Sequence, residues 1–197
     1  MSESLAGPVQ GGRLPGSGIG FEMRAHNCFA CGQLNAHGLR LALHFEHRRC
    51  WTELVIPERF EGWEGLAHGG ILSTILDEVM AWALVEQDSW GVTARMTVDF
   101  RRPVAVGTAI RAEGEITDAR RRLFRTQGRI VDLGTGALLV TAEGVYVAAP
   151  EERKRQLKER YGFRLLGPEP GAVADPGDLR LGRRPEARPD PRPEVAG

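Results

Sequence analysis

The chain has 197 residues and a formal net charge of zero, and 42% of its residues are apolar. This length and apolar content suffice for one domain with a sizeable core. A balanced charge gives no overall attraction to nucleic acid, so we expect no nucleic-acid partner. No apolar run approaches the roughly 20 residues that span a membrane, and the N-terminal residues lack the apolar core of a signal peptide. We expect a cytoplasmic protein without a membrane partner.

Both ends of the sequence are predicted to be disordered. Residues 1–25 begin with a stretch rich in Gly, Ser and Pro, and residues 164–197 hold seven of the twelve prolines. Proline removes backbone donors and excludes helix, and few apolar residues are left there to bury. The folded unit is therefore expected over residues 26–163, as one domain.

The three cysteines are an odd and low number, which suits a reducing compartment. Cys28 and Cys31 form a Cys-x-x-Cys pair, but zinc needs two further ligands. The histidines nearby do not have the spacing of a standard zinc module: His26, His37 and His44. A redox dithiol usually lies between a strand and a helix, whereas this pair precedes a strand. The sequence favours thiols that pack a tight turn, and we expect no metal and no cofactor.

Alternating apolar side chains predict the next elements in chain order. Residues 39–47 and 50–57 are predicted strands, and a long helix begins near Gly69 or Gly70. Four strand-like runs follow, at 92–103, 108–118, 122–133 and 137–149. A short charged helix over 150–163 ends the unit.

This order indicates an α+β fold, with one long helix against an antiparallel sheet of five to six strands, because neighbouring strands have short connections. Gly114, Gly128 and Gly144 each interrupt a strand. Glycine at these positions would let the helix lie close across the sheet, and β-bulges are the other interpretation.

The helix carries two adjacent carboxylates, Asp77 and Glu78, within an apolar pattern. At 100° per residue the apolar side chains form one wide stripe, with Asp77 on one shoulder and Glu78 on the opposite one. The two acids therefore face different neighbours, and we expect one site to use at most one of them.

The helix begins with His68-Gly69-Gly70. The first N–H groups of a helix have no partner inside it, so these glycines could cradle an oxyanion, or they could merely form the turn. Gly69 and Asp77 are about 12 Å apart along a helix that rises ~1.5 Å per residue, too far to serve one carbonyl. Two antiparallel copies would join Gly69 of one chain to Asp77 of the other, which predicts a homodimer with two composite sites.

These residues resemble the hotdog-fold acyl-CoA thioesterases, in particular their PaaI-like branch. That branch has His-Gly-Gly followed by Asp nine residues after the His, as this chain does at His68 and Asp77. The run 91–107 is similar to a family strand with a hydroxyl near its start, here Thr93, and a proline at its end. The "CFACGQLNAHGLRL" segment is similar to the opening of many bacterial members. The resemblance covers about residues 26–149.

The resemblance implies a hotdog fold and hydrolysis of an acyl-CoA thioester without metal or organic cofactor. It implies that the Gly69 N–H polarises the carbonyl, that Asp77 of the partner chain acts as nucleophile or general base, and that Thr93 holds the water or the carboxylate. His68 would shape the loop or meet the thiol leaving group. Gly62 departs from the pattern, since some relatives have asparagine there, so a side-chain donor is missing or supplied from elsewhere.

Substrate binding is expected at Gly70, Arg101 and Arg102, because arginine suits the phosphates of CoA. A solvated arginine pair is the alternative. The expected partners are acyl-CoA and a second copy of the chain, with a dimer of dimers also open.

Two other functions stay open. A hotdog dehydratase would remove water from a 3-hydroxyacyl thioester with a His and an acid, although the acid here has the PaaI-like spacing. A non-catalytic acyl-CoA-binding protein would join the hotdog domain to a DNA-binding helix-turn-helix, for which the Gly-rich and Pro-rich ends leave no room.

Overall fold

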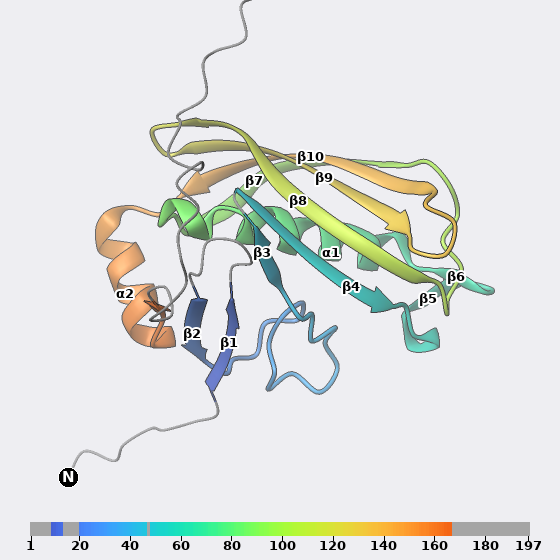
Figure 1. Ribbon diagram of the computed structural model, residues 1–197, viewed down its shortest axis with the longest axis horizontal. Coiled ribbons are helices and arrows are strands. Elements are labelled where there is room, and N and C mark those ends of the chain that lie inside the picture. Colours follow the sequence, from blue (N-terminus) through green and yellow to red (C-terminus); the bar gives the residue numbers. More distant parts are fainter. Residues whose placement is uncertain (1–8, 14–19, 47, 167–197) are drawn as a thin grey trace, which may run out of the picture.

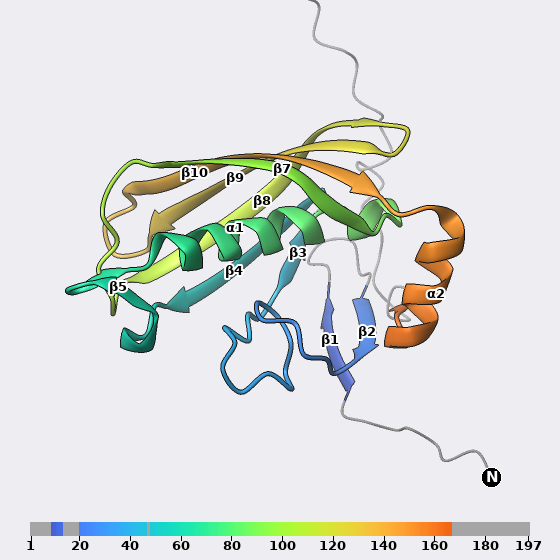
Figure 2. The same cartoon turned by 180° about the vertical axis from the view of Figure 1, so that it is seen from behind.

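The computed structural model describes residues 9–13, 20–46 and 48–166. Its main layer is a six-stranded antiparallel sheet in the order β3-β4-β8-β9-β10-β7, and helix α1 (Gly69–Trp82) lies across one face of it (Figures 1 and 2). The strands of this sheet are β3 (His44–Glu46), β4 (Arg49–Val55), β7 (Gly91–Phe100), β8 (Ala109–Arg120), β9 (Leu123–Asp132) and β10 (Leu138–Ala148). The predicted α+β hotdog architecture, one long helix wrapped by an antiparallel sheet, is confirmed.

Shorter elements complete the described part of the chain. A second sheet has the order β1-β2-β11, and a two-stranded ribbon, β5-β6, precedes α1. These elements and the remaining helices are β1 (Val9–Arg13), β2 (Gly20–Arg24), two 3₁₀ helices (Glu58–Phe60 and Val85–Gln87), β5 (Glu61–Trp63), β6 (Leu66–Ala67), α2 (Glu151–Tyr161) and β11 (Arg164–Leu166). Among the described residues, no helix has the length and apolar character needed to cross a membrane.

The helix packs through the predicted stripe, whose buried members are Leu72, Ile75, Leu76, Val79 and Met80. A Cβ on Gly114 of β8 would lie 2.6 Å from the backbone nitrogen of Met80, so glycine lets the helix backbone rest directly on the strand. A Cβ on Gly128 of β9 would meet only side-chain atoms of Leu76 and Met80, at 3.0 and 3.1 Å. Gly144 instead makes room for Tyr146 and Thr126.

The strand predicted over 39–47 is shorter in the structure. β3 begins only at His44, because Arg40 has a left-handed φ of 52° that interrupts an extended chain. Leu41 and Phe45 are nevertheless buried in the core. The alternation of apolar residues therefore predicted which side chains are buried, but it predicted too early a start for the strand.

The folded part begins earlier and ends later than the predicted 26–163. β2 places Phe21 and Met23 in the core, and β11 pairs with β2 beyond Phe163. Phe21 makes an edge-on contact with Phe45, with ring centroids 5.2 Å apart. The sequence did not predict strand β2, because it has only two buried apolar side chains and follows a glycine-rich stretch. The rest of the predicted disorder, at 1–8, 14–19 and 167–197, lies outside the described residues.

Candidate active site

The start of α1 offers one free backbone donor. His68 caps the helix, and its Nδ1 accepts a hydrogen bond from the Gly70 N–H at 2.9 Å. The His68 carbonyl accepts from Ile71 at 2.9 Å and Leu72 at 3.3 Å. Of the first four N–H groups, only that of Gly69 has no acceptor within the described parts of the chain. Gly70, predicted to bind substrate, has its N–H engaged by His68.

Two further residues shape the surroundings of this donor. A Cβ on Gly69 would lie 3.2 Å from the Phe100 ring, so glycine leaves room for the ring beside the N–H. A Cβ on Gly62 would lie 2.8 Å from the Cα of His68, so His68 occupies the space that a larger residue at position 62 would need. Because Nδ1 of His68 accepts a hydrogen bond, its Nε2 carries the hydrogen in the neutral ring. That Nε2–H is a side-chain donor next to Gly69.

The Asp77 carboxylate is held by one oxygen. Its Oδ1 accepts hydrogen bonds from Thr93 Oγ1 at 2.6 Å and from the Tyr146 hydroxyl at 2.9 Å. No described residue donates to Oδ2, so this oxygen is left to act on a substrate or a water. The structure thus joins Asp77 to Thr93, as predicted, and adds Tyr146.

Tyr146 was missed by the sequence analysis. It is fully buried on β10, and its hydroxyl also lies 3.2 Å from the Asp77 carbonyl oxygen. Burial raises the pKa of Tyr146, and the charge of Asp77 raises it further, so the phenol stays a donor at neutral pH. The sequence could have indicated Tyr146, because it lies on the apolar face of a predicted strand and a buried phenol needs a partner for its hydroxyl.

A β-bulge turns Thr93 toward the helix. In the ladder of β7 and β10, Met96 pairs with Gly144, but the next inward residue, Tyr146, pairs with Thr93. Ala94 is therefore an extra residue on β7. Strict alternation would place Ala94 on the same face as Met96 and point Thr93 away, whereas the bulge shifts the phase by one residue. This brings two hydroxyls side by side beneath one carboxylate.

Glu78 points to other neighbours, as the helical periodicity predicted. Its Oε1 accepts from the Trp82 indole N–H at 2.7 Å, and its two oxygens lie 4.0 and 3.9 Å from the Cys28 sulfur. Burial, together with the charge of Cys28, raises the pKa of Glu78 to about 7. Asp77 and Glu78 have no hydrogen-bond partner in common among the described residues.

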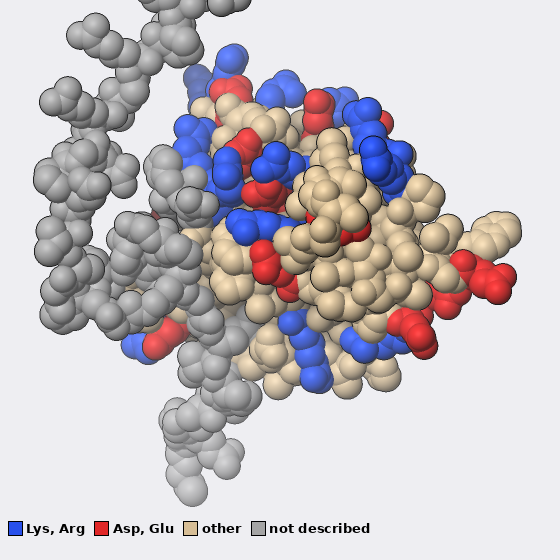
Figure 3. All heavy atoms as spheres, turned by 45° about the vertical axis from the view of Figure 1, so that its right-hand side comes forward, with Lys and Arg blue, Asp and Glu red and all other residues tan. Residues whose placement is uncertain are grey.

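The two arginines after β7 do not join this cluster within one chain. Arg101 contacts Asp99 at 3.8 Å and Thr141 at 3.4 Å, in a groove of about 400 Å³ on the outer face of the sheet. Arg102 is exposed, and its N–H donates to the Leu139 carbonyl at 3.1 Å. Basic and acidic side chains are intermixed on the face shown in Figure 3 rather than separated by sign.

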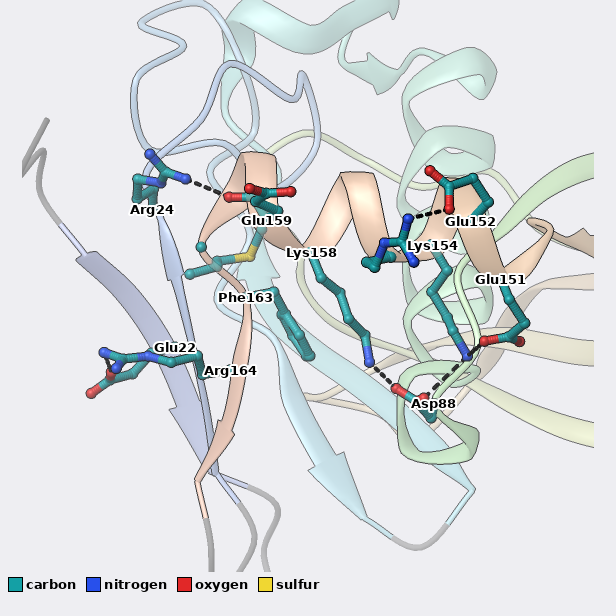
Figure 4. Close-up of a pocket in the computed structure, with 13 residues that line it drawn as sticks. Glu22, Arg24, Asp88, Glu151, Glu152, Lys154, Lys158, Glu159, Phe163 and Arg164 are labelled. Carbon is teal, nitrogen blue, oxygen red and sulfur yellow. Dashed lines mark hydrogen bonds and ion pairs between the residues drawn. The ribbon is translucent and has the colours of Figure 1, made fainter.

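A larger groove, of about 1070 Å³, lies between α2, β2 and Asp88 (Figure 4). Its lysines are paired, since Lys154 lies 3.1 Å from Asp88 and Lys158 also contacts Asp88. Arg24 donates to the Glu159 carbonyl at 2.5 Å. With its cations engaged, this groove is a poor match for an anionic ligand, and neither Gly69 nor Asp77 lines it.

Comparisons with known proteins concern the fold and part of the sequence. Residues 64–138, which include His68, Gly69, Asp77 and Thr93, match the thioesterase superfamily. A solved thioesterase superfamily protein superimposes with a TM-score of 0.57 at 23% identity, over 61% of this chain and 60% of that one. The match therefore spans less than two thirds of that protein.

Two further structures are similar. The Escherichia coli PaaI protein of the phenylacetic acid degradation operon gives a TM-score of 0.53 at 17% identity, over 56% of this chain and 80% of that one. The smu.793 protein of Streptococcus mutans, bound to acetyl-CoA, gives 0.53 at 13% identity, over 60% and 97%. No curated protein matches the sequence. The superpositions establish the hotdog fold, and the sequence match to the thioesterase superfamily is confined to residues 64–138.

Proposed function

We propose that the protein hydrolyses an acyl-CoA thioester to a free acid and CoA. The observation that carries this proposal is that one helix holds both a free Gly69 N–H and an Asp77 carboxylate that is fixed by one oxygen and open at the other. A backbone N–H at a helix start stabilises the negative charge that develops on a thioester carbonyl. A positioned carboxylate can activate water or attack the carbonyl itself. The superfamily match and the acetyl-CoA-bound neighbour support this chemistry.

Each residue of the proposed site has a separate role in hydrolysis. The thioester oxygen accepts from Gly69 while Asp77 Oδ2 takes a proton from water, and the resulting hydroxide adds to the carbonyl carbon. Collapse of the tetrahedral intermediate breaks the C–S bond and expels CoA, whose sulfur takes the proton held by the Asp77 carboxyl, while His68 Nε2–H can donate a hydrogen bond to the departing sulfur. As a nucleophile, Asp77 would instead form an anhydride that water then cleaves. Thr93 and Tyr146 keep Oδ1 in place along either route.

The site is proposed to form between two chains. Gly69 and Asp77 lie on one helix, about 12 Å apart at ~1.5 Å per residue. β7 is an edge strand of ten residues, and Val92 and Phe100 on it are 71% and 53% exposed. A long, apolar edge strand is a template for pairing. Antiparallel pairing of β7 with a second copy would align two helices in opposite directions, and would carry Arg101 and Arg102 toward the partner's site, where CoA phosphates could meet them.

A thiol-release screen tests the proposal. The protein is incubated with aryl-, short-, medium- and long-chain acyl-CoAs, and free CoA is measured against the Asp77→Asn variant. We expect release from at least one class well above that control. Absence of release from every class, or binding without turnover, contradicts the proposal. Loss of water from a 3-hydroxyacyl-CoA without thiol release would assign the site to a dehydratase.

A further inference from the structure

A second group of reactive side chains meets on α1 away from Asp77. Cys28 and Cys31 lie in the loop between β2 and β3, and Glu78 projects from the helix toward them. One ligand atom from each of these three residues lies within 4.8 Å of the other two. His26 Nε2 lies 3.9 Å from the Cys31 sulfur. The thioester chemistry uses none of the four.

We propose that Cys28, Cys31 and Glu78 bind a zinc ion, with His26 supporting the Cys31 thiolate. This differs from the expectation of no metal, which rested on the lack of further ligands near the Cys-x-x-Cys pair. The carboxylate that completes the group, Glu78, lies 50 positions after Cys28 in the chain and therefore could not be recognised from the Cys-x-x-Cys motif.

The separations suit zinc. With Zn–S bonds of about 2.3 Å and Zn–O bonds of about 2.0–2.2 Å, tetrahedral ligand atoms are about 3.5–3.8 Å apart. The Cys28 sulfur lies 4.0 and 3.9 Å from the two Glu78 oxygens. For this pair, bond formation needs movements of only a few tenths of an ångström, and the other separations in the group are at most 4.8 Å. Thiolate together with carboxylate in a four-coordinate site is a ligand set that zinc accepts, and a water would fill the fourth position.

The loop is shaped to present thiolates. Any Cβ on Gly32 would overlap with the backbone of His26 and Cys28, so only glycine permits this tight turn after Cys31. The Gly32 N–H donates to the Cys28 carbonyl at 2.9 Å. The turn holds the two cysteine sulfurs within 4.8 Å of each other, so that one ion could reach both.

His26 is placed to hold the second thiolate. Its Nδ1 accepts from the Cys28 N–H at 3.3 Å, so its Nε2 carries the hydrogen in the neutral ring and directs it to the Cys31 sulfur. Its ring also lies edge-on to Tyr161 of α2, with centroids 5.6 Å apart. His26 is a positioning residue, comparable to the outer groups that orient metal ligands.

Among the described residues, the lack of a cationic side chain paired with Glu78 also favours a bound metal ion. The carboxyl of Glu78 is partly buried between a helix and a loop, and its described contacts are one indole N–H and thiols. No described Lys or Arg forms an ion pair with it. Buried carboxylates are normally paired with a cation. A divalent cation supplies the positive charge that the described residues leave out, and it would fasten the loop to the central helix.

Metal content tests the proposal. The protein is expressed with zinc, passed through a desalting column, and analysed by plasma mass spectrometry. We expect about one zinc per chain in the wild type and less than about a tenth of that in Cys28→Ser, Cys31→Ser and Glu78→Gln. Asp77→Asn and Cys50→Ala are the matched controls, a neighbouring acid and the third thiol, and both should keep the metal. His26→Ala should bind zinc more weakly than the wild type.

A second measurement uses only the wild type, so that misfolding of a variant does not decide the question. Cobalt added to metal-free protein should give thiolate-to-cobalt charge-transfer absorption, and zinc should abolish it. Less than about a tenth of a zinc per chain without such absorption overturns the proposal. A Cys28–Cys31 disulfide in zinc-free protein, detected by mass spectrometry without reductant, would overturn it in favour of a redox pair. Because Asp77→Asn should lose hydrolysis and keep zinc, the two assignments fail separately.

Discussion

Two hydroxyls on Oδ1 give Asp77 a fixed orientation and leave its other oxygen open. Asp77→Asn keeps an acceptor for both donors, so we expect an intact fold and a fall in kcat/KM of about 10²–10⁴-fold, the usual size of a lost general base. Asp118→Asn, on a half-buried residue that pairs with Arg120 away from the proposed site, is the matched control and should leave hydrolysis unchanged. An Asp77→Asn variant within about threefold of the wild type would exclude Asp77 from the chemistry.

Tyr146 should contribute through the orientation of Asp77. Tyr146→Phe keeps the buried ring and removes one donor, so we expect a loss of about 1 kcal/mol in the free energy of unfolding. We also expect a lower kcat at nearly constant KM, because the carboxylate is held less firmly. Combining it with Thr93→Val should lower kcat more than either change alone. Stability from urea unfolding and kcat from thiol release measure both effects, and an unchanged kcat in the double variant would contradict the role.

At the level of elements, the contact between α1 and β8 depends on one missing side chain. Gly114→Ala would place a methyl group against the helix backbone, so we expect about 1–3 kcal/mol of destabilisation. Gly128→Ala is a close control, because Gly128 faces Gly114 across the ladder and its added methyl would meet only flexible side chains. Denaturant unfolding compares the two. A smaller loss for Gly114→Ala than for Gly128→Ala would contradict this account of the packing.

Periodicity was sufficient for most of the elements, because α1 and the strands of the main sheet are amphipathic over ten or more residues in most cases. It also separated Asp77 from Glu78, since helical geometry alone decides on which side each acid lies. It failed where a local event changes the phase: the left-handed Arg40 ended a predicted strand, and the bulge at Ala94 reversed Thr93. A bulge leaves no mark in the pattern of apolar residues.

The parts of the sites that escaped prediction depend on contacts between distant residues. Tyr146 reaches Asp77 across 69 positions, and Cys28 reaches Glu78 across 50. Neither pair shares a motif, so only the assembled fold brings them together. The separation of Gly69 and Asp77 could be predicted from the sequence because both lie on one regular helix, where spacing converts directly into distance.

For the whole molecule, the composite site predicts that two inactive chains can restore each other. Asp77→Asn is co-expressed with Gly69→Pro, which deletes the N–H and is tolerated in the first turn of a helix better than elsewhere. In a mixed dimer one site joins intact Gly69 to intact Asp77. Random mixing should restore roughly a quarter of wild-type activity, because half the dimers are mixed and one of their two sites works.

Gly69→Ala is the matched control for this experiment, since it adds a Cβ but keeps the N–H, and it should retain activity as a single variant. If both inactive chains fold and mix yet no activity returns, Asp77 does not serve the partner's carbonyl.

Metal removal should separate the two sites of the molecule. Hydrolysis is expected without added metal and after treatment with EDTA, because Asp77 contacts β7 and β10 whereas Glu78 contacts the loop before β3. The same treatment should lower the melting temperature if it extracts zinc, since zinc would bind only the folded loop. Thiol release and thermal unfolding before and after treatment measure both. Loss of hydrolysis together with the metal, restored by zinc, would show that the chemistry needs the ion.

If the site forms between two copies at the β7 edge, as proposed, catalysis depends on the concentration of the protein. A chain that must borrow a carboxylate from a second copy is inert when alone, so specific activity should fall on dilution and recover when the protein is concentrated again. Substrate that bridges both copies would slow that loss, because it binds only the assembled form. The rate of turnover would then rise more steeply than the concentration of the protein. At the lowest concentrations it would rise with the square of that concentration.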